Sequence, residues 1–231
     1  MFLSGTDNFR LKVDSEYKAN RKDFEKPVHY QAIKDYLIKY HPTEVVNFIE
    51  ADDALGMWLY AHSRHDDINQ CHRCIASLDK DLDMIPGFHY NFNHDRMYWI
   101  DEDYAIRMYF RQLLTGDTVD NIPGIPGMGN TTAETYLDMY DTDYEVIHAI
   151  YNAYVDWLKD ADAAATRLAQ NMSLLWIQRE PNDVPYMYGY VASGQWIGES
   201  YQPVPYTRTK TGRIKFNGQK DTTSKELSVV D

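Results

Sequence analysis

Apolar residues in the first hundred positions alternate between strand-like runs and helical spacings. Runs of strand length occupy 1–4, 44–49, 74–78, 88–92 and 97–100, the last two separated by a turn typical of a hairpin. Helical spacing of apolar residues over 29–40 and 51–61 predicts helices between the strands. Strands that alternate with helices favour a parallel or mixed sheet covered by helices, so the predicted fold class is α/β.

After residue 100 the pattern becomes helical. Asp101 is a typical N-cap for a helix over 104–114, and further helices are predicted at 131–140, 144–158 and 160–178. Prolines and tyrosines are frequent from 181, and the last residues are polar. The expected organisation is therefore an α/β core over 1–110, a helical subdomain over 111–180, and an extension with a flexible polar tail over 181–231.

The composition is that of an ordinary globular chain. Of 231 residues, 44% are apolar and 25% are charged. No apolar run approaches the roughly 18–20 residues of a membrane span, and the opening MFLSGTDNFR does not resemble a signal peptide. Only two cysteines are present, which excludes a disulfide framework and is consistent with a reducing cytoplasm. We therefore expect no membrane partner.

The net charge of −12 argues against nucleic-acid binding by the chain as a whole, because such binding normally shows a basic surface. The charge is unevenly distributed, however. The stretch 50–120 is strongly acidic, and both ends of the chain are more basic. Two interpretations follow: a metal site flanked by phosphate-binding surfaces, or an acidic surface that serves solubility.

Three acidic motifs lie where predicted strands end or loops begin. They are E-A-D-D at 50–53, D-K-D at 79–81 and D-T-V-D at 117–120, and together they supply the carboxylates Glu50, Asp52, Asp53, Asp79, Asp81, Asp117 and Asp120. Asp117 and Asp120 share a face if their stretch is helical. Sites in open α/β sheets gather at the carboxyl ends of strands, and clustered carboxylates suit Mg²⁺ or Mn²⁺. Each motif alone also fits a helix cap or a turn.

A Gly/Pro-rich stretch, I-P-G-I-P-G-M-G at 122–129, follows the third acidic motif. Its glycines permit close backbone approach, and it leads into a helix predicted to begin near 130–132. Free N–H groups at such a helix start bind phosphate without reading base sequence. The alternative is a loop that only reverses the chain.

The ordered set of motifs resembles the 5′-nuclease superfamily, which includes flap endonucleases, bacteriophage 5′–3′ exonucleases and the 5′-nuclease domain of bacterial DNA polymerase I. The stretch 116–133 is similar to the helix–three-turn–helix signature of that superfamily. E-A-D-D at 50–53 and S-L-D-K-D-L at 77–82 are similar to its metal-binding motifs, and Y-K-A-N-R at 17–21 resembles the element that opens its helical arch. I-P-G-F-H-Y-N at 85–91 is similar to the phage branch.

The resemblance implies a PIN-like core with a helical arch, a helical duplex-binding module, and metal-dependent hydrolysis of DNA phosphodiesters near 5′ ends or flaps by two Mg²⁺ or Mn²⁺ ions. It makes the seven carboxylates direct or water-mediated ligands, and it assigns Lys18 and Arg21 to the scissile phosphate. It assigns DNA contacts to Tyr17, Ile122, Gly124, Ile125, Gly127, Gly129 and Thr131, with K⁺ bound at the turn. It also implies phage replication proteins as partners, in the cytoplasm of an infected bacterium.

The sequence departs from the superfamily pattern near its start. Members begin with a strand that carries an aspartate, some tens of residues before the Y-K-x-N-R element, and that strand is absent here. A second metal aspartate, usually before the element that here is Phe9-Arg10, aligns near Ser4. The alternative function is therefore a non-catalytic protein that binds DNA structures, or one fragment of a split nuclease.

Overall fold

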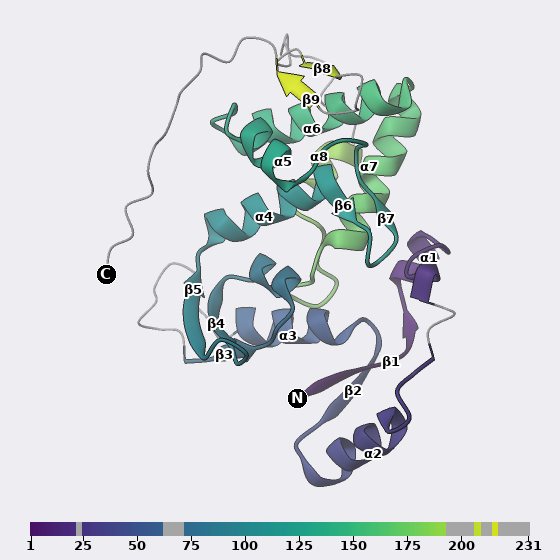
Figure 1. Cartoon of the computed structure of the whole chain (residues 1–231), viewed down its shortest axis with the longest axis vertical. Helices are drawn as coiled ribbons and strands as arrows, with labels where there is room; N and C mark the ends of the chain where they lie inside the picture. Colours follow the sequence, from purple (N-terminus) through teal and green to yellow (C-terminus); the bar gives the residue numbers. More distant parts are fainter. Residues whose placement is uncertain (22–24, 62–71, 193–205, 209–213, 217–231) are drawn as a thin grey trace.

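The structure is a computed structural model that describes residues 1–21, 25–61, 72–192, 206–208 and 214–216. Figure 1 shows two parts: small sheets with helices α1–α3 below, and helices α4–α8 above. An α/β core followed by a helical part confirms the predicted fold class. Within the described residues, no helix is long and apolar enough to cross a membrane.

The α/β part contains two separate sheets rather than one. Strand β1 (Phe2–Asn8) pairs in parallel with β2 (Glu44–Phe48), and helix α2 (Tyr30–Tyr40) connects them. Strand β3 (Cys74–Ala76) pairs in parallel with β4 (Gly87–Asn91), which forms the predicted hairpin with β5 (Arg96–Ile100). Helix α3 (Ala51–Tyr60) packs across β1, β2 and β3. The expectation of a single sheet is therefore not met among the described strands.

The first strand and the segment after it are more ordered than the sequence predicts. The strand predicted over 1–4 continues to Asn8, because its later residues pair with the end of β2 after an irregularity in register. The expected irregular stretch after it contains the short helix α1 (Arg10–Val13) and the 3₁₀ turn η1 (Ala19–Arg21). These turns bring the 17–21 motif next to the loop at 118–121.

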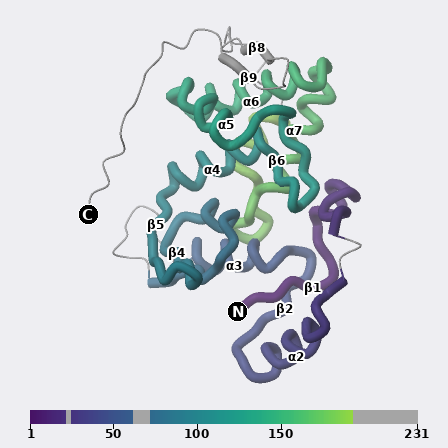
Figure 2. The backbone as a smooth tube through the Cα atoms, viewed as in Figure 1, coloured from purple at the N-terminus to yellow at the C-terminus, as the bar shows by residue number. Residues whose placement is uncertain are grey.

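The helical part forms most of the hydrophobic core. Its elements are α4 (Glu102–Thr115), α5 (Asn130–Leu137), α6 (Asp143–Leu158), α7 (Ala161–Leu175) and the short α8 (Tyr188–Ala192). The predicted N-cap is confirmed, because the side chain of Asp101 accepts a hydrogen bond from the backbone N–H of Tyr104. Tyr109, Tyr136 and Tyr154 are fully buried between these helices. The tube in Figure 2 shows α4 leading from the sheets into this bundle.

Two short strands carry the third acidic motif into the Gly/Pro turn. Strand β6 (Gly116–Asp117) pairs antiparallel with β7 (Ile122–Pro123). Buried Asn171 of α7 fixes this turn, because its amide donates to the carbonyl of Pro123 at 2.8 Å and to the hydroxyl of Tyr154 at 2.7 Å. Asp117 and Asp120 would share a face only in a helix, and that condition is not met, because a strand and a turn occupy the stretch.

The C-terminal extension is described in part. After α8 the structure places β8 (Tyr206–Arg208) and β9 (Ile214–Phe216), which pair antiparallel. The flexible polar tail predicted for the end of the chain falls largely outside the described residues. A 3₁₀ segment, η3 (Lys80–Met84), completes the path between β3 and β4.

Candidate nuclease site

A cavity of about 250 Å³ opens between the sheets and the helical part. Six of the seven predicted carboxylates line it: Glu50, Asp52, Asp79, Asp81, Asp117 and Asp120. Four cationic side chains share the cavity: Arg10, Lys18, Arg21 and Lys80. The acidic motifs are far apart in the sequence, so the fold itself brings them together.

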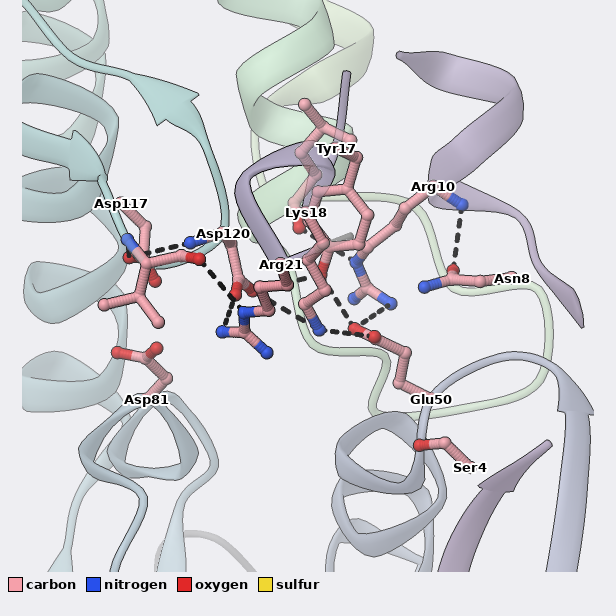
Figure 3. A network of polar contacts seen from close by, with 12 residues as sticks. Ser4, Asn8, Arg10, Tyr17, Lys18, Arg21, Glu50, Asp81, Asp117 and Asp120 are labelled. Atoms are coloured by element: carbon pink, nitrogen blue, oxygen red, sulfur yellow. Dashed lines mark hydrogen bonds and ion pairs between the residues drawn. The ribbon is translucent and has the colours of Figure 1, made fainter. Parts of the chain in front are cut away.

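Tyr17 and Lys18 join two of these carboxylates. The hydroxyl of Tyr17 donates to Glu50 at 2.8 Å and to Asp120 at 3.1 Å, and the Nζ of Lys18 pairs with both residues (Figure 3). Burial and the neighbouring Glu50 carboxylate raise the pKa of Tyr17 well above its usual value. The hydroxyl therefore stays protonated and holds the two carboxylates close to each other.

Arg21 lies at the open side of the cavity. Its guanidinium pairs with Asp120, and its side chain is 45% exposed. The Nε of Arg21 also donates to the carbonyl of Val119 at 3.1 Å. Lys18, by comparison, is 26% exposed. Both cations are therefore positioned between the carboxylates and solvent, where an incoming phosphate would meet them first.

Asp52 of α3 and Asp79, the N-cap of η3, both line the cavity. Burial, with Asp79 and Glu50 as the main neighbouring charges, raises the pKa of Asp52 to about 6. Asp79 caps η3 by accepting from the backbone N–H of Asp81 at 3.0 Å. The turn interpretation of this motif is thus confirmed, because Asp79 caps a turn. Asp79 also lines the cavity, and its role as a metal ligand stays a prediction.

Asp81 and Asp117 lie on the other side of the site from Glu50 in the view of Figure 3. Asp81 accepts hydrogen bonds from Lys80 at 3.2 Å and from Gln112 of α4. Burial raises the pKa of Asp81 above its ordinary value, with Asp79 and Asp117 adding to the effect and Lys80 opposing it. Asp117 accepts from the backbone N–H of Val119 at 2.8 Å, which shapes the turn to Asp120. Burial is thus the main cause of the raised pKa of both Asp52 and Asp81, and neighbouring carboxylates add to it.

Asp53 has a different position from the one expected of a metal ligand. It is fully buried, and Arg10 binds both of its oxygens at 2.6 Å and 2.9 Å. The same carboxylate accepts from the backbone N–H groups of Glu50 and Gln178. Burial alone would lower the pKa of Arg10, but the bonds and charge of Asp53 raise it, so the pair stays ionised. Asp53 thus links α1, the start of α3 and the segment that follows α7.

The predicted DNA contacts differ in exposure, and Gly124 is half-buried. Tyr17, Ile122 and Ile125 are buried to 3%, 3% and 2% exposure, so their side chains anchor the site and cannot stack on a base. Gly127, Gly129 and Thr131 are exposed. Gly129 is the N-cap of α5 and supplies no side-chain cap, which leaves backbone N–H groups of the first turn available to an anion.

Sequence reasoning missed Arg10 and Gln112 as site residues. Both are nearly buried, and both hydrogen-bond a carboxylate of an acidic motif. The available signal for Arg10 was the match of Phe9-Arg10 to an element of the superfamily pattern, since the surrounding sequence T-D-N-F-R-L-K is polar and does not predict a buried arginine. Gln112 gave no signal, since its place on α4 resembles that of any helical glutamine.

The cavity is lined by side chains of the type that binds a hard divalent cation. Carboxylate oxygens are the preferred ligands of Mg²⁺, and six carboxylates line the cavity. Among the described side chains, no three His, Cys, Asp or Glu residues converge closely enough to hold an ion as they stand. Glu50 and Asp120 are instead engaged by Lys18, Arg21 and Tyr17.

Comparison with known proteins confirms the resemblance to the 5′-nuclease superfamily. The chain is 32% identical over 142 residues to an exonuclease of Escherichia phage T7, covering 59% of this chain and 46% of that protein. It is 28% identical over 191 residues to a 5′-3′ exonuclease of Buchnera aphidicola, covering 75% of this chain and 61% of the relative. The chain thus spans about half the length of these relatives. No family model matches it.

The fold is that of a solved phage protein. A bacteriophage T5 flap endonuclease, crystallised with DNA and metal ions, aligns with a TM-score of 0.55 and 20% identity over 85% of this chain and 79% of that one. A DNA polymerase I of Rhizobium leguminosarum is 31% identical over 152 residues, which is 61% of this chain and 15% of the polymerase. The likeness to T5 is one of fold, and the relatives similar in sequence are an exonuclease, a 5′-3′ exonuclease and a DNA polymerase I.

Proposed function

We propose that the chain is a metal-dependent 5′–3′ exonuclease or flap endonuclease that hydrolyses DNA phosphodiesters near 5′ ends. The observation that carries this proposal is the cavity in which six carboxylates meet Lys18 and Arg21. Two comparisons support the proposal. Relatives that are similar in sequence are called exonucleases, and a flap endonuclease of the same fold was crystallised with DNA and metal ions.

The cofactor we propose is Mg²⁺ or Mn²⁺, bound as two ions. Asp52, Asp79, Asp81 and Asp117 would hold them, with Glu50 and Asp120 contributing once Lys18 and Arg21 engage substrate. Bound in pairs, such ions activate water and stabilise charge on the attacking and leaving oxygens of a phosphodiester. Asp53 is excluded from this ligand set, because both of its carboxylate oxygens already accept hydrogen bonds from Arg10 and from two backbone N–H groups.

The chain's own cations would bind and orient the scissile phosphate. Lys18 is held with a φ of 56° by its backbone N–H, which donates to the carbonyl of Asp120 at 2.9 Å. Its Nζ therefore points into the cavity from a fixed backbone. Arg21, more exposed, presents a planar guanidinium that suits two phosphate oxygens at once. Positive charge placed here stabilises the charge that develops on the phosphoryl group.

The duplex would bind at the turn that leads into α5. Exposed Gly127, Gly129 and Thr131 leave the backbone accessible, and the N-terminus of α5 favours an anion. Gly124 takes part through its backbone, and K⁺ would bind among carbonyls of the same turn. We extend the proposal to phage replication proteins as partners in the cytoplasm of an infected bacterium, on the basis of the likeness to phage exonucleases.

Cleavage of a 5′-labelled flap duplex in Mg²⁺ tests the proposal. The Asp79→Asn variant removes a cavity carboxylate, and Asp103→Asn makes the same change at an exposed position on α4. We expect product from the wild-type chain and from Asp103→Asn, and a loss on the order of 100-fold in Asp79→Asn. Equal rates for all three chains would refute the assignment of the cavity.

A second function, binding of DNA structures without cleavage, is favoured by one observation. The described carboxylates do not converge on a three-ligand metal site in their present conformation. Binding of the same flap duplex in Ca²⁺, measured by fluorescence anisotropy, separates the two functions. Binding without any product in Mg²⁺ or Mn²⁺ would select the second function, and product that depends on Asp79 would select the first.

A further inference from the structure

Gln112 is a buried amide with an unpaired oxygen in the wall of the cavity. It lies on the last turn of α4, is 5% exposed, and lines the cavity among carboxylates. The next residues, Leu113 and Leu114, are fully buried, so this part of α4 packs into an apolar core. No group of the described residues donates to its buried oxygen, Oε1. Such an oxygen lowers the stability of a fold, so stability alone does not account for this residue.

The amide nitrogen of Gln112 fixes one oxygen of Asp81. Its Nε2 donates to Oδ1 of Asp81 at 2.5 Å, and the Nζ of Lys80 donates to the same oxygen at 3.2 Å. The Lys80 side chain is 77% exposed, so water competes with its bond, whereas Gln112 is buried. An ionised carboxylate only accepts hydrogen bonds, so the amide must turn its nitrogen toward Asp81. Gln112 is therefore the firmer of the two restraints on this carboxylate.

The second oxygen of Asp81 has no such bond. Among the described residues no group donates to Oδ2, although the side chain is only 26% exposed. Both donors occupy Oδ1 and leave Oδ2 available to a ligand in the cavity. In Glu50, by contrast, both oxygens accept hydrogen bonds, one from Lys18 and one from Tyr17. A neutral amide also restrains Asp81 without adding a positive charge that would repel a cation.

The place of Gln112 on α4 connects two acidic motifs. Helix α4 leads directly into β6, whose Asp117 lines the same cavity, whereas Asp81 belongs to η3 of the α/β part. Figure 3 shows Asp81 and Asp117 on the same side of the site. The bond from Gln112 therefore ties Asp81 to the helix that carries Asp117 beyond its end, and it restrains the position of one carboxylate relative to the other.

We propose that Gln112 is a positioning residue for Asp81: it holds Oδ1 and so presents Oδ2 to a divalent cation in the cavity. The inference rests on the proposed function, because it takes the cavity to bind such a cation. Gln112 itself contacts neither the cation nor DNA in this arrangement. It acts through the orientation of Asp81 and through its placement relative to Asp117, as residues that hydrogen-bond a metal ligand commonly do.

Mn²⁺ binding and urea unfolding of the full chain test this role without DNA. Gln112→Met keeps the length of the side chain but removes both the donor and the unpaired oxygen. We expect the affinity for Mn²⁺, measured by isothermal titration calorimetry, to fall about 10-fold or more. The urea midpoint in EDTA should stay at or above that of the wild type, because an unpaired buried oxygen is lost. The matched control Gln31→Met removes an exposed hydrogen bond to Asp35 on α2 and should leave the Mn²⁺ affinity unchanged.

A double-mutant cycle shows whether Gln112 acts through Asp81. In the Asp81→Asn chain, Gln112→Met should cost little further Mn²⁺ affinity. In the Asp52→Asn chain, which changes a cavity carboxylate that has no hydrogen bond to Gln112, it should cost its full effect. Equal losses in both chains would overturn the proposal. A urea midpoint of Gln112→Met below that of the wild type in EDTA would show a structural role and would overturn it as well.

The result for Asp81→Asn alone separates this inference from the proposed function. If Asp81→Asn loses Mn²⁺ affinity and Gln112→Met does not, the role of Gln112 fails and the ligand set stands. If neither variant loses affinity, the assignment of Asp81 as a metal ligand fails together with the role of Gln112.

Discussion

Replacement of Asp53 tests whether this residue of the E-A-D-D motif stabilises the fold or binds metal. Asp52 and Asp53 are adjacent in E-A-D-D, yet the structure gives them opposite surroundings. Asp52 lines the cavity, whereas Asp53 is fully buried against Arg10. We therefore expect Asp53→Asn to destabilise the fold even without metal, and Asp52→Asn to leave the fold intact.

The size of the effect follows from the contacts of Arg10. Its guanidinium is 2% exposed and donates to Asp53 at 2.6 Å and 2.9 Å, and to the carbonyls of Leu174 and Trp176 at 2.9 Å and 2.6 Å. Removal of one partner leaves a buried, uncompensated charge, which costs about 3–5 kcal/mol. At about 2–4 °C per kcal/mol for a chain of this size, the Tm would fall by about 6–20 °C.

Urea unfolding followed by circular dichroism, in EDTA, measures this loss. The matched chain is Asp52→Asn, the same chemical change one residue earlier. The double variant Arg10→Met with Asp53→Leu should recover most of the stability, because apolar replacements of a buried pair are often neutral. If Asp53→Asn unfolds at the wild-type urea concentration in EDTA and differs only in Mg²⁺, Asp53 is a metal ligand and the structural assignment is refuted.

Three further predictions concern the cavity and its turn. The pKa of Asp52 is raised to about 6 from an ordinary value near 4, so folding favours its protonated form and stability should fall as pH rises from about 4 to about 6. In a series of Tm measurements against pH in EDTA, Asp52→Asn should flatten this fall. The same dependence of Tm on pH in the variant and the wild type would contradict the prediction. Tyr17→Phe removes the donor shared by Glu50 and Asp120 and should cost about 1–3 kcal/mol in urea unfolding, whereas a wild-type midpoint would show that the bridge adds no stability. Gly116→Ala should cost at least about 1–3 kcal/mol of stability, because φ is 66° and the added Cβ would lie 2.3 Å from the backbone nitrogen of Gly124. Gly129→Ala has open space around its Cβ and should unfold like the wild type. Equal losses of stability in both variants would refute this interpretation of the turn.

Local signals in the sequence were sufficient for most helices and for the hairpin. The helix predicted at 104–114 runs from Glu102 to Thr115 behind the expected cap Asp101, because capping and apolar spacing act within a few residues. Strand β1 was predicted too short, because its second half is determined by pairing with β2, some forty residues away. The separation into two sheets likewise depends on pairing across the chain, which periodicity does not reveal.

The candidate site shows the same limit at the level of single residues. Acidic motifs at strand ends indicated the cavity, and six of seven carboxylates reach it. Asp53 does not, because successive residues at a helix start point about 100° apart and its partner Arg10 lies far away in the sequence. The pattern D-x-x-D at 117–120 suggested a helical face, but the backbone pairing of Gly116 with Pro123 makes the segment a strand followed by a turn.

The Y-K-A-N-R segment assembles the cavity as well as lining it. The amide of Asn20 donates to the carbonyl of Thr118 at 2.9 Å, and the amide of Asn121 donates back to the carbonyl of Glu16 at 2.7 Å. These side-chain bonds lock the segment onto the loop that carries Asp120. The cations beside Asn20 are therefore held next to that carboxylate, so in the proposed function Lys18 and Arg21 would be in place before a phosphate arrives. Such preorganisation is what electrostatic stabilisation of a reacting phosphate requires.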